Sequence, residues 1–100
     1  MKLDVEGDTL CVSGVRQLGA ANASSFRDWV REAMSAGGRN LDIDLAQTTF
    51  LDSCGLGALV ALHKTVRGRS GTLRLLHPQP PVQQLLELTR MDQLFEIVKA

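Results

Sequence analysis

The stretch that decides the fold of this chain is Phe50-Leu51-Asp52-Ser53-Cys54-Gly55-Leu56-Gly57. An alternating segment, Leu41-Asp42-Ile43-Asp44-Leu45, comes shortly before it, and a helical pattern, Ala58 to Arg67, follows it. Alternation is typical of a strand, so the quoted stretch is predicted to lead from a strand end into a helix. Ser53 then stands at the start of that helix, exposed and close to free backbone N–H groups.

The residues before and after this stretch predict the remaining elements. Short period-two runs predict an antiparallel hairpin around the turn Glu6-Gly7-Asp8, and residues 14–21 are expected to be irregular. A first helix is expected to be capped by Asn22 or Ser24 and to stop at Gly37-Gly38. The later elements are a strand over 72–76, a third helix opened by Pro80-Pro81, and an apolar run, 94–98, that fits either a strand or a helix.

The order of these elements predicts an α/β fold in a single domain over residues 1–100. The later strands are joined through helices and are therefore expected to be parallel, whereas the first two form the hairpin. Residues 41, 43 and 45 are apolar while Asp42 and Asp44 face the other way, which predicts a sheet covered on one side only. One mixed sheet of four to five strands, with helices packed on one face, satisfies both observations.

The overall composition argues against several classes of function. Lysine plus arginine equal aspartate plus glutamate at 11 each, so the basic excess typical of a nucleic-acid surface is absent. No apolar run approaches the ~20 residues that span a bilayer, and the first residues do not form a signal peptide. We therefore expect a cytoplasmic monomer without membrane insertion. Cys11 and Cys54 lack disulfide-framework spacing and His63 and His77 lack ligand-like neighbours, so neither a metal nor another cofactor is expected.

On these residues the chain resembles a STAS domain, the module shared by sulfate transporters and bacterial anti-sigma-factor antagonists. The resemblance is carried chiefly by the alternating strand 41–45 followed by the stretch 50–57, whose Asp-Ser-x-Gly-Leu-Gly core is fairly specific in that context. It extends more loosely over almost the whole chain, through Gly14, the helix start Pro81-Val82 and the tail 91–97.

The resemblance implies a partner-switching regulator and not an enzyme. In the family, an anti-sigma factor that is also a serine kinase phosphorylates the serine after the aspartate. The unmodified antagonist binds that kinase and releases the sigma factor, and a phosphatase resets the system. The matching residue here is Ser53, with Asp52 and Gly55 supporting the phosphorylation site, and Cys54 stands where relatives commonly have serine.

The chemistry of a helix start supports this role for Ser53. A phosphoserine adds about −1.5 to −2 charges at neutral pH, which the free N–H groups and the helix dipole tolerate, so the fold should survive. A partner packed over the turn would have to desolvate that dianion without a counter-charge, at a cost of several kcal/mol. Since about 1.4 kcal/mol is tenfold in affinity, one phosphate is enough to abolish a micromolar complex.

The second helix also predicts where a partner docks. At about 100° per residue, one side of the helix forms the core stripe, and its members are Gly55, Ala58, Leu59, Leu62 and Val66. Leu56 and Val60 fall on the flank, near Lys64. We predict that Leu56, Val60 and the rim cation Lys64 contact the partner, together with Cys54 and Gly57 beside Ser53.

Other interpretations of the same residues stay open. Asp52 and Ser53 are common helix-capping residues, Gly55 and Gly57 suit close packing or close approach of a partner, and Cys54 suits a small packed side chain. With the same fold, the chain would serve as the STAS subunit that binds the ATPase of a lipid-transporting ABC transporter, or as a switch acting on secretion or a phosphatase. A small serine hydrolase built on Ser53 is a further alternative, disfavoured because Gly-x-Ser-x-Gly is missing.

Overall fold

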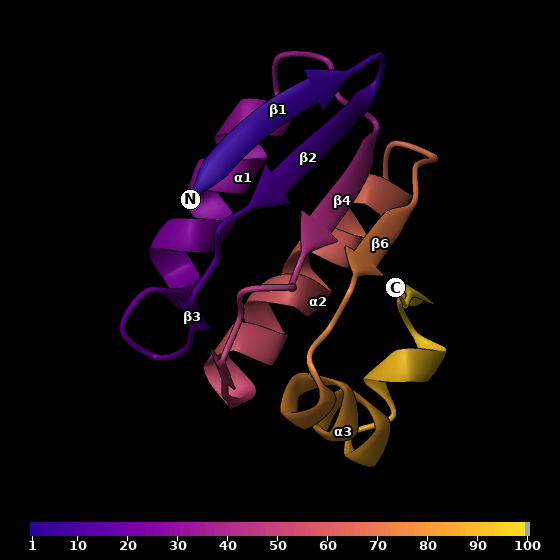
Figure 1. Ribbon diagram of the computed structural model, residues 1–100. Helices are drawn as coiled ribbons and strands as arrows, with labels where there is room; N and C mark the ends of the chain where they lie inside the picture. The colour runs from indigo at the N-terminus through magenta and orange to yellow at the C-terminus, as the bar shows by residue number, and fades with distance from the viewer. Residues whose placement is uncertain (100) are drawn as a thin grey trace.

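The structure is a computed structural model that describes residues 1–99, with the elements arranged as in Figure 1. The helices are α1 (Ala23–Met34), α2 (Ser53–Arg67) and α3 (Pro80–Leu88), followed by a 3₁₀ turn, η1 (Met91–Gln93). The strands are β1 (Lys2–Glu6), β2 (Thr9–Ser13), β3 (Gln17–Leu18), β4 (Asn40–Asp44), β5 (Phe50–Leu51), β6 (Leu73–Leu76) and β7 (Glu96–Val98). None of the helices in residues 1–99 has the length and apolar character needed to cross a bilayer.

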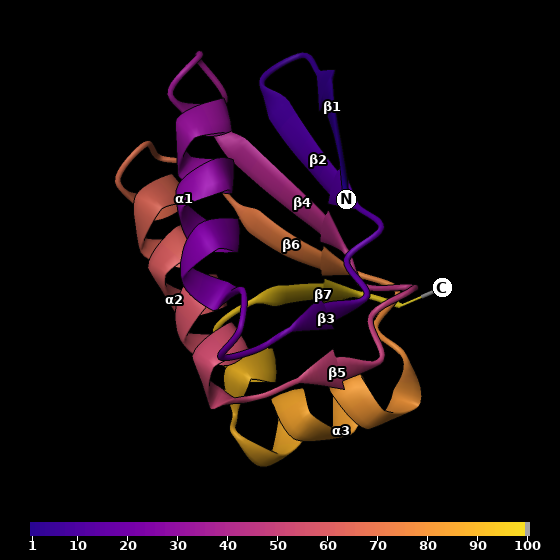
Figure 2. The same ribbon diagram turned by 90° about the vertical axis from the view of Figure 1, so that its left-hand side faces the viewer.

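A five-stranded mixed sheet lies at the centre of the fold, in the order β1-β2-β4-β6-β7. The pair β1 and β2 is antiparallel, and every other neighbouring pair in this sheet is parallel. α1 and α2 cover one face of the sheet, as Figure 2 shows, while α3 lies beyond the carboxyl ends of β4 and β6 (Figure 1). The predicted α/β fold, with its hairpin and its parallel later strands, is confirmed.

The covered face of the sheet and the two helices enclose one apolar core. In β4 the alternation works as predicted, because Leu41 and Ile43 have no exposed surface, and Leu45 just beyond the strand has none either. Full burial of such a side chain stabilises the fold by roughly 1.5–3 kcal/mol relative to leaving it in water. The helices contribute Phe26, Val30 and Met34 from α1, and Leu59, Leu62 and Val66 from α2.

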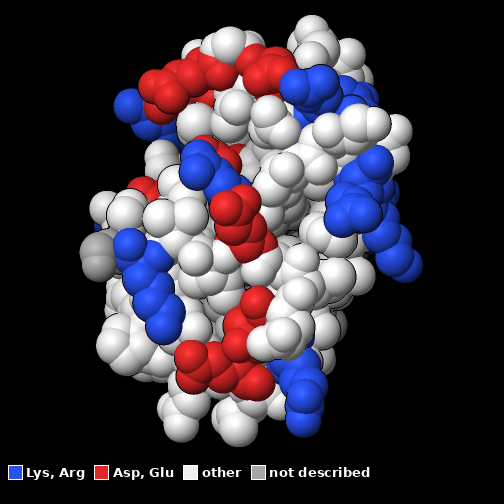
Figure 3. Space-filling model, turned by 90° about the vertical axis from the view of Figure 1, so that its right-hand side faces the viewer, with Lys and Arg blue, Asp and Glu red and all other residues white. Residues whose placement is uncertain are grey.

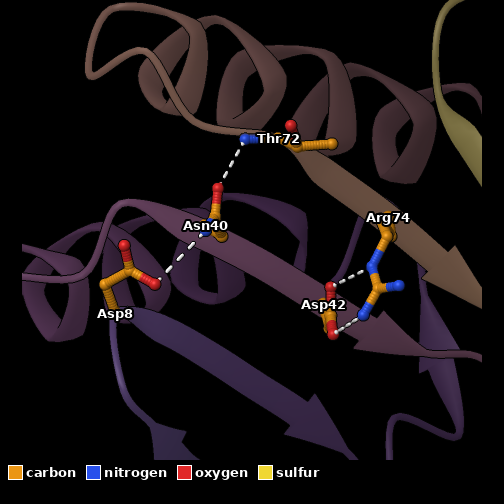
Figure 4. Close-up of polar contacts among 5 residues, drawn as sticks. All are labelled: Asp8, Asn40, Asp42, Thr72 and Arg74. Carbon is orange, nitrogen blue, oxygen red and sulfur yellow. Dashed lines mark hydrogen bonds and ion pairs between the residues drawn. The ribbon is translucent and has the colours of Figure 1, made fainter.

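The uncovered face of the sheet is polar and internally paired (Figure 4). Arg74 of β6 donates two hydrogen bonds to Asp42 of β4, from Nε to Oδ1 at 2.8 Å and from Nη2 to Oδ2 at 2.6 Å. Asp42 therefore retains only 6% of its surface although it faces away from the helices. Asn40 joins the same strands by accepting from the Thr72 N–H at 2.9 Å. These contacts hold β4 and β6 in register.

Charged residues of both signs lie on the side of the molecule drawn in Figure 3. Acidic side chains form a band along the top of this view and basic side chains gather along its right-hand edge, while charges of both signs lie in its middle and lower parts. Neither sign covers the whole of this side, in line with the equal numbers of basic and acidic residues in the sequence.

A second, two-stranded sheet was not predicted. Residues 14–21 contain β3, which pairs in parallel with β5 through Gln17↔Phe50 and Leu18↔Leu51. Thr48, which is fully buried, donates its hydroxyl to the Val15 carbonyl and fixes the approach of the two segments. Strands of two residues are too short to show alternation, so the expectation of irregular chain here was wrong. The pairing brings the segment before α1 against the segment before α2 (Figure 2).

The apolar run near the C-terminus, which fitted either a helix or a strand, contains a strand. Within it β7 pairs in parallel with β6 through Arg74↔Glu96, Leu75↔Ile97 and Leu76↔Val98. Phe95, just before β7, is 4% exposed and lies edge-on to the His63 ring at 5.6 Å between centroids. This segment forms a strand because the edge of the central sheet offers unpaired backbone groups to an extended chain.

Candidate functional site

The candidate site lies where β5 turns into α2. Asp52 has an extended backbone, with φ −120° and ψ −173°, and its side chain accepts a hydrogen bond from the Gly55 N–H at 3.0 Å. Asp52 is therefore the N-cap residue of α2, and Ser53 is the first helical residue. Ser53 and Cys54 are both exposed. The structure thus has the strand-to-helix turn with an exposed serine that the sequence predicts.

The Asp52 carboxylate also reaches across to another segment. Its Oδ2 accepts from the Ala20 N–H at 3.1 Å, in the loop between β3 and α1. The hydrogen bond from Gly55, followed by burial acting in the opposite sense and then the hydrogen bond from Ala20, leaves the pKa of Asp52 below its ordinary value. Asp52 is therefore held as an anion that ties the β3–α1 loop to the first turn of α2.

The β3–α1 loop is ordered by the side chain of Asn22. Its Oδ1 accepts from the Gly19 N–H at 3.0 Å, and its Nδ2 donates to the Gln17 carbonyl at 2.9 Å. Asn22 stands at the N-cap position of α1, as predicted, but its side chain makes no capping bond to the helix. It closes the loop instead, through these two hydrogen bonds.

The two glycines of α2 have different surroundings. A Cβ atom on Gly55 would stand 2.2 Å from the Leu18 carbonyl oxygen, so only glycine lets α2 approach β3 this closely. A Cβ atom on Gly57 would meet nothing within 4 Å. Of the two roles that the sequence left open, close packing therefore applies to Gly55, while Gly57 leaves the helix surface bare next to Ser53.

The predicted docking residues on α2 divide into two groups. Ser53, Gly57 and Lys64 are exposed and Val60 is half-buried, and their spacing places them along one side of the helix. Leu56, by contrast, is only 9% exposed and belongs to the core, so the expectation that it lies off the core stripe was wrong. α1 and β5 contact α2 in addition to the sheet, so the buried side of α2 is wider than contact with the sheet alone would make it.

Cys54 is free and exposed, so the interpretation of it as a small packed side chain was wrong. Cys54 is the second residue of α2, and its side chain is exposed in the first turn of the helix. Cys54 therefore belongs to the accessible surface beside Ser53. Its contact with a partner stays a prediction.

Sequence reasoning missed Phe50, which lies two residues before Asp52. Leu51 turns inward at 8% exposed, and Phe50, its neighbour in the two-residue strand, is 49% exposed. A hollow of about 380 Å³ lies beside Phe50 and is lined also by Asp52 and residues 19–22. An inward Leu51 sends Phe50 outward, but a strand of two residues is too short for the sequence to show this alternation.

The surroundings of Ser53 bear on the hydrolase alternative. No cluster of three or more His, Cys, Asp or Glu side chains suited to a metal ion occurs within residues 1–99. His63 lies ten residues after Ser53 on the same helix, a rise of about 15 Å, so the two side chains cannot form a hydrogen bond. The pKa of His63 is lowered by its burial and by the charge of Arg67.

Comparison with known proteins places these features in a family context. The family model of the STAS domain matches residues 1–100. A "Putative anti-sigma factor antagonist" of Thermotoga maritima is 28% identical over 91 residues, which cover 90% of this chain and 80% of that protein. A STAS-domain containing protein of Pseudomonas aeruginosa is 32% identical over 89 residues, which cover 89% of this chain and 85% of the relative.

Two solved structures show the same fold. The crystal structure of an anti-sigma factor antagonist, also described as putative, from Thermotoga maritima has a TM-score of 0.93 at 24% identity, covering 99% of this chain and 86% of that one. The Bacillus cell fate determinant SpoIIAA in its phosphorylated form has a TM-score of 0.78 at 17% identity, covering 99% of this chain and 89% of that one.

Proposed function

This chain belongs to the STAS domain family, and from that membership we propose that it is an anti-sigma factor antagonist controlled by phosphorylation of Ser53. In this proposal the unmodified protein binds an anti-sigma factor that is also a serine kinase. Phosphorylation of Ser53 releases that partner, and a phosphatase restores the unmodified form. The protein acts in the cytoplasm by binding and not by catalysis.

The observation that carries the proposal is the exposed hydroxyl of Ser53 on the first residue of α2. A kinase can reach a side chain in this position without unfolding the domain. Its neighbours Cys54 and Gly57 are also exposed, so a partner can pack directly around the hydroxyl. A relative named as a putative anti-sigma factor antagonist is 28% identical over a stretch that covers 90% of this chain, which supports the same role here.

A phosphate on Ser53 should leave the fold intact. The helix dipole favours negative charge at this end, typically by 0.3–1 kcal/mol at an exposed site. The Gly55 N–H already donates to Asp52, so the phosphate does not compete for this cap and projects towards solvent. Modification therefore changes the surface charge without changing the core.

The same phosphate should weaken the complex strongly. It places about two negative charges next to the Asp52 anion, where a partner must remove water from both. Desolvating an unpaired charge costs several kcal/mol, and each 1.4 kcal/mol lowers affinity about tenfold. We propose that the contact surface runs along α2 from Ser53 and Cys54 through Gly57 and Val60 to Lys64, with Leu56 supporting it from below.

The decisive experiment measures phosphorylation directly. The purified chain is incubated with ATP and, in turn, each anti-sigma factor kinase of the same genome, and its intact mass is recorded. We expect one added phosphoryl group on the wild type and none on Ser53→Ala. Binding to the unmodified chain is then measured by isothermal titration calorimetry, where Ser53→Asp should lower affinity at least a hundredfold.

Ser24 offers a matched control for that substitution. It is an exposed serine in the first turn of α1, so Ser24→Asp adds the same charge at the start of a different helix. Ser24→Asp should bind as the wild type does. Equal affinity of Ser53→Asp and the wild type for the kinase would refute the switch. Tight binding to a transporter ATPase that is indifferent to Ser53→Asp would assign the chain to the ABC-transporter alternative.

A further inference from the structure

Phe50 is the large apolar side chain exposed next to the phosphorylation site. It is 49% exposed although it sits in a strand, and it precedes Ser53 by three residues. Hollows flank it on both sides, one of about 380 Å³ towards residues 19–22 and one of about 120 Å³ towards Pro81 and Leu85 of α3. A half-exposed aromatic side chain between two hollows is a suitable contact site for a partner protein.

The polar groups around the larger hollow are already paired within the protein. Both oxygens of Asp52 accept backbone hydrogen bonds, from Gly55 and from Ala20. The Asn22 amide is used twice, as an acceptor from Gly19 and as a donor to Gln17. The remaining lining consists of Phe50, two alanines and the exposed Gln17 at the rim. An occupant of this hollow therefore gains little from polar groups and most from apolar contact.

From this arrangement we propose that Phe50 and the larger hollow are the docking site for a large apolar side chain of the anti-sigma factor kinase. The inference rests on the proposed function and adds a specific anchor to it. The hollow is large enough to admit a leucine, methionine or aromatic side chain, and Phe50 forms one wall against which that side chain packs. The partner surface thus extends beyond α2 onto the β3–α1 loop and β5.

Asp52 connects this anchor to the switch. Its carboxylate holds Ala20, which forms the far wall of the hollow, and it caps the helix on which Ser53 stands. A partner side chain in the hollow therefore contacts Asp52, which directly precedes the residue that becomes charged. Phosphorylation of Ser53 would place a hydrated dianion at the rim of an apolar contact, which explains how one modification acts on the whole interface.

The test uses the kinase that modifies Ser53, with affinity measured by titration calorimetry. Phe50→Ala should raise the Kd about 30-fold, the loss typical of an aromatic anchor. Ala21→Glu keeps Phe50 and puts a charge into the hollow from an exposed position, and it should raise the Kd at least tenfold. Melting temperatures establish that each variant is folded; if Phe50→Ala is not, Ala21→Glu decides.

A remote hollow provides two controls, an apolar residue truncated to alanine and the same alanine-to-glutamate substitution. Val5 is 72% exposed and Ala36 is exposed, and both line a hollow between the β1–β2 hairpin and the end of α1. Val5→Ala and Ala36→Glu should change the Kd less than twofold. Wild-type affinity of Phe50→Ala and Ala21→Glu, while Ser53→Asp still fails to bind, overturns this inference and leaves the proposed function intact. If Ser53→Asp also binds with wild-type affinity, both the docking site and the proposed function are refuted.

Discussion

Replacing Gly55 with alanine tests how closely α2 must approach β3. An alanine Cβ at this position would stand 2.2 Å from the Leu18 oxygen, 2.7 Å from Leu51 Cδ1 and 2.9 Å from the Leu18 carbonyl carbon. The nearest atom, the Leu18 oxygen, belongs to the backbone, which cannot rotate away as a side chain can. α2 would have to withdraw by about 1 Å to restore ordinary contact distances.

The size of the effect follows from two opposing terms. Alanine favours a helix over glycine by about 1 kcal/mol, whereas forcing extra volume into a packed site costs typically 1–3 kcal/mol and occasionally more. Since the clash is with backbone, the cost should reach about 3 kcal/mol and leave Gly55→Ala about 2 kcal/mol less stable than wild type. In a domain of 100 residues this lowers the melting temperature by roughly 10 °C.

Gly57→Ala is the matched control, since it makes the same change two residues further along the same helix. Its Cβ would meet nothing within 4 Å, so only the helix preference remains, and the variant should be about 0.5–1 kcal/mol more stable. Both variants are measured by urea unfolding followed by circular dichroism. Equal stability of Gly55→Ala and Gly57→Ala would contradict the packing of α2 against β3.

Three further predictions concern buried or tied polar groups. Backbone hydrogen bonds lower the pKa of Asp52 from 3.8, so its contribution to stability is complete above the unfolded pKa and lost as the pH falls through the lower folded pKa. Asp52→Asn should therefore lose less melting temperature than wild type between pH 5 and pH 2. Thr48→Val leaves the Val15 carbonyl without its buried donor and should cost about 1–3 kcal/mol in urea unfolding, whereas Thr48→Ser should cost less. Arg74→Met leaves Asp42, 6% exposed, without its partner and should cost about 3 kcal/mol. Asp42→Asn should cost less because Arg74 can reach water. The double variant should lose less stability than the sum of the losses of the two single variants.

Much of the fold could be predicted because its signals are local. The alternation of residues 41–45 and the helix stripe of α2 each report burial on one side of one element, and the proline pair of α3 reports where a helix begins. The exposed Ser53 at the strand-to-helix turn could be predicted for the same reason. Such patterns survive in a single sequence because periodicity depends only on backbone geometry.

The candidate site was less predictable where distant segments meet. The bond from Ala20 to Asp52 spans 32 residues, and no local pattern announces it. Leu56 was expected off the core because α2 was considered against the sheet alone. In the structure α1 and β5 also contact α2, and Leu56 is buried. Phe50 was overlooked because exposure of one residue in a two-residue strand becomes evident only when its neighbours are in place.

The amino-acid sequence by itself determined the order of the main helices and strands, the mixed sheet with parallel later strands, and the position of a modifiable hydroxyl at a helix start. These follow from short-range rules on alternation, capping and chain connection, which act within a few residues. Only the tertiary structure decided which surface surrounds that hydroxyl. The pairing of β3 with β5 brings the loop at residues 19–22 beside Asp52 and leaves Phe50 exposed, because burial depends on what the rest of the chain places nearby.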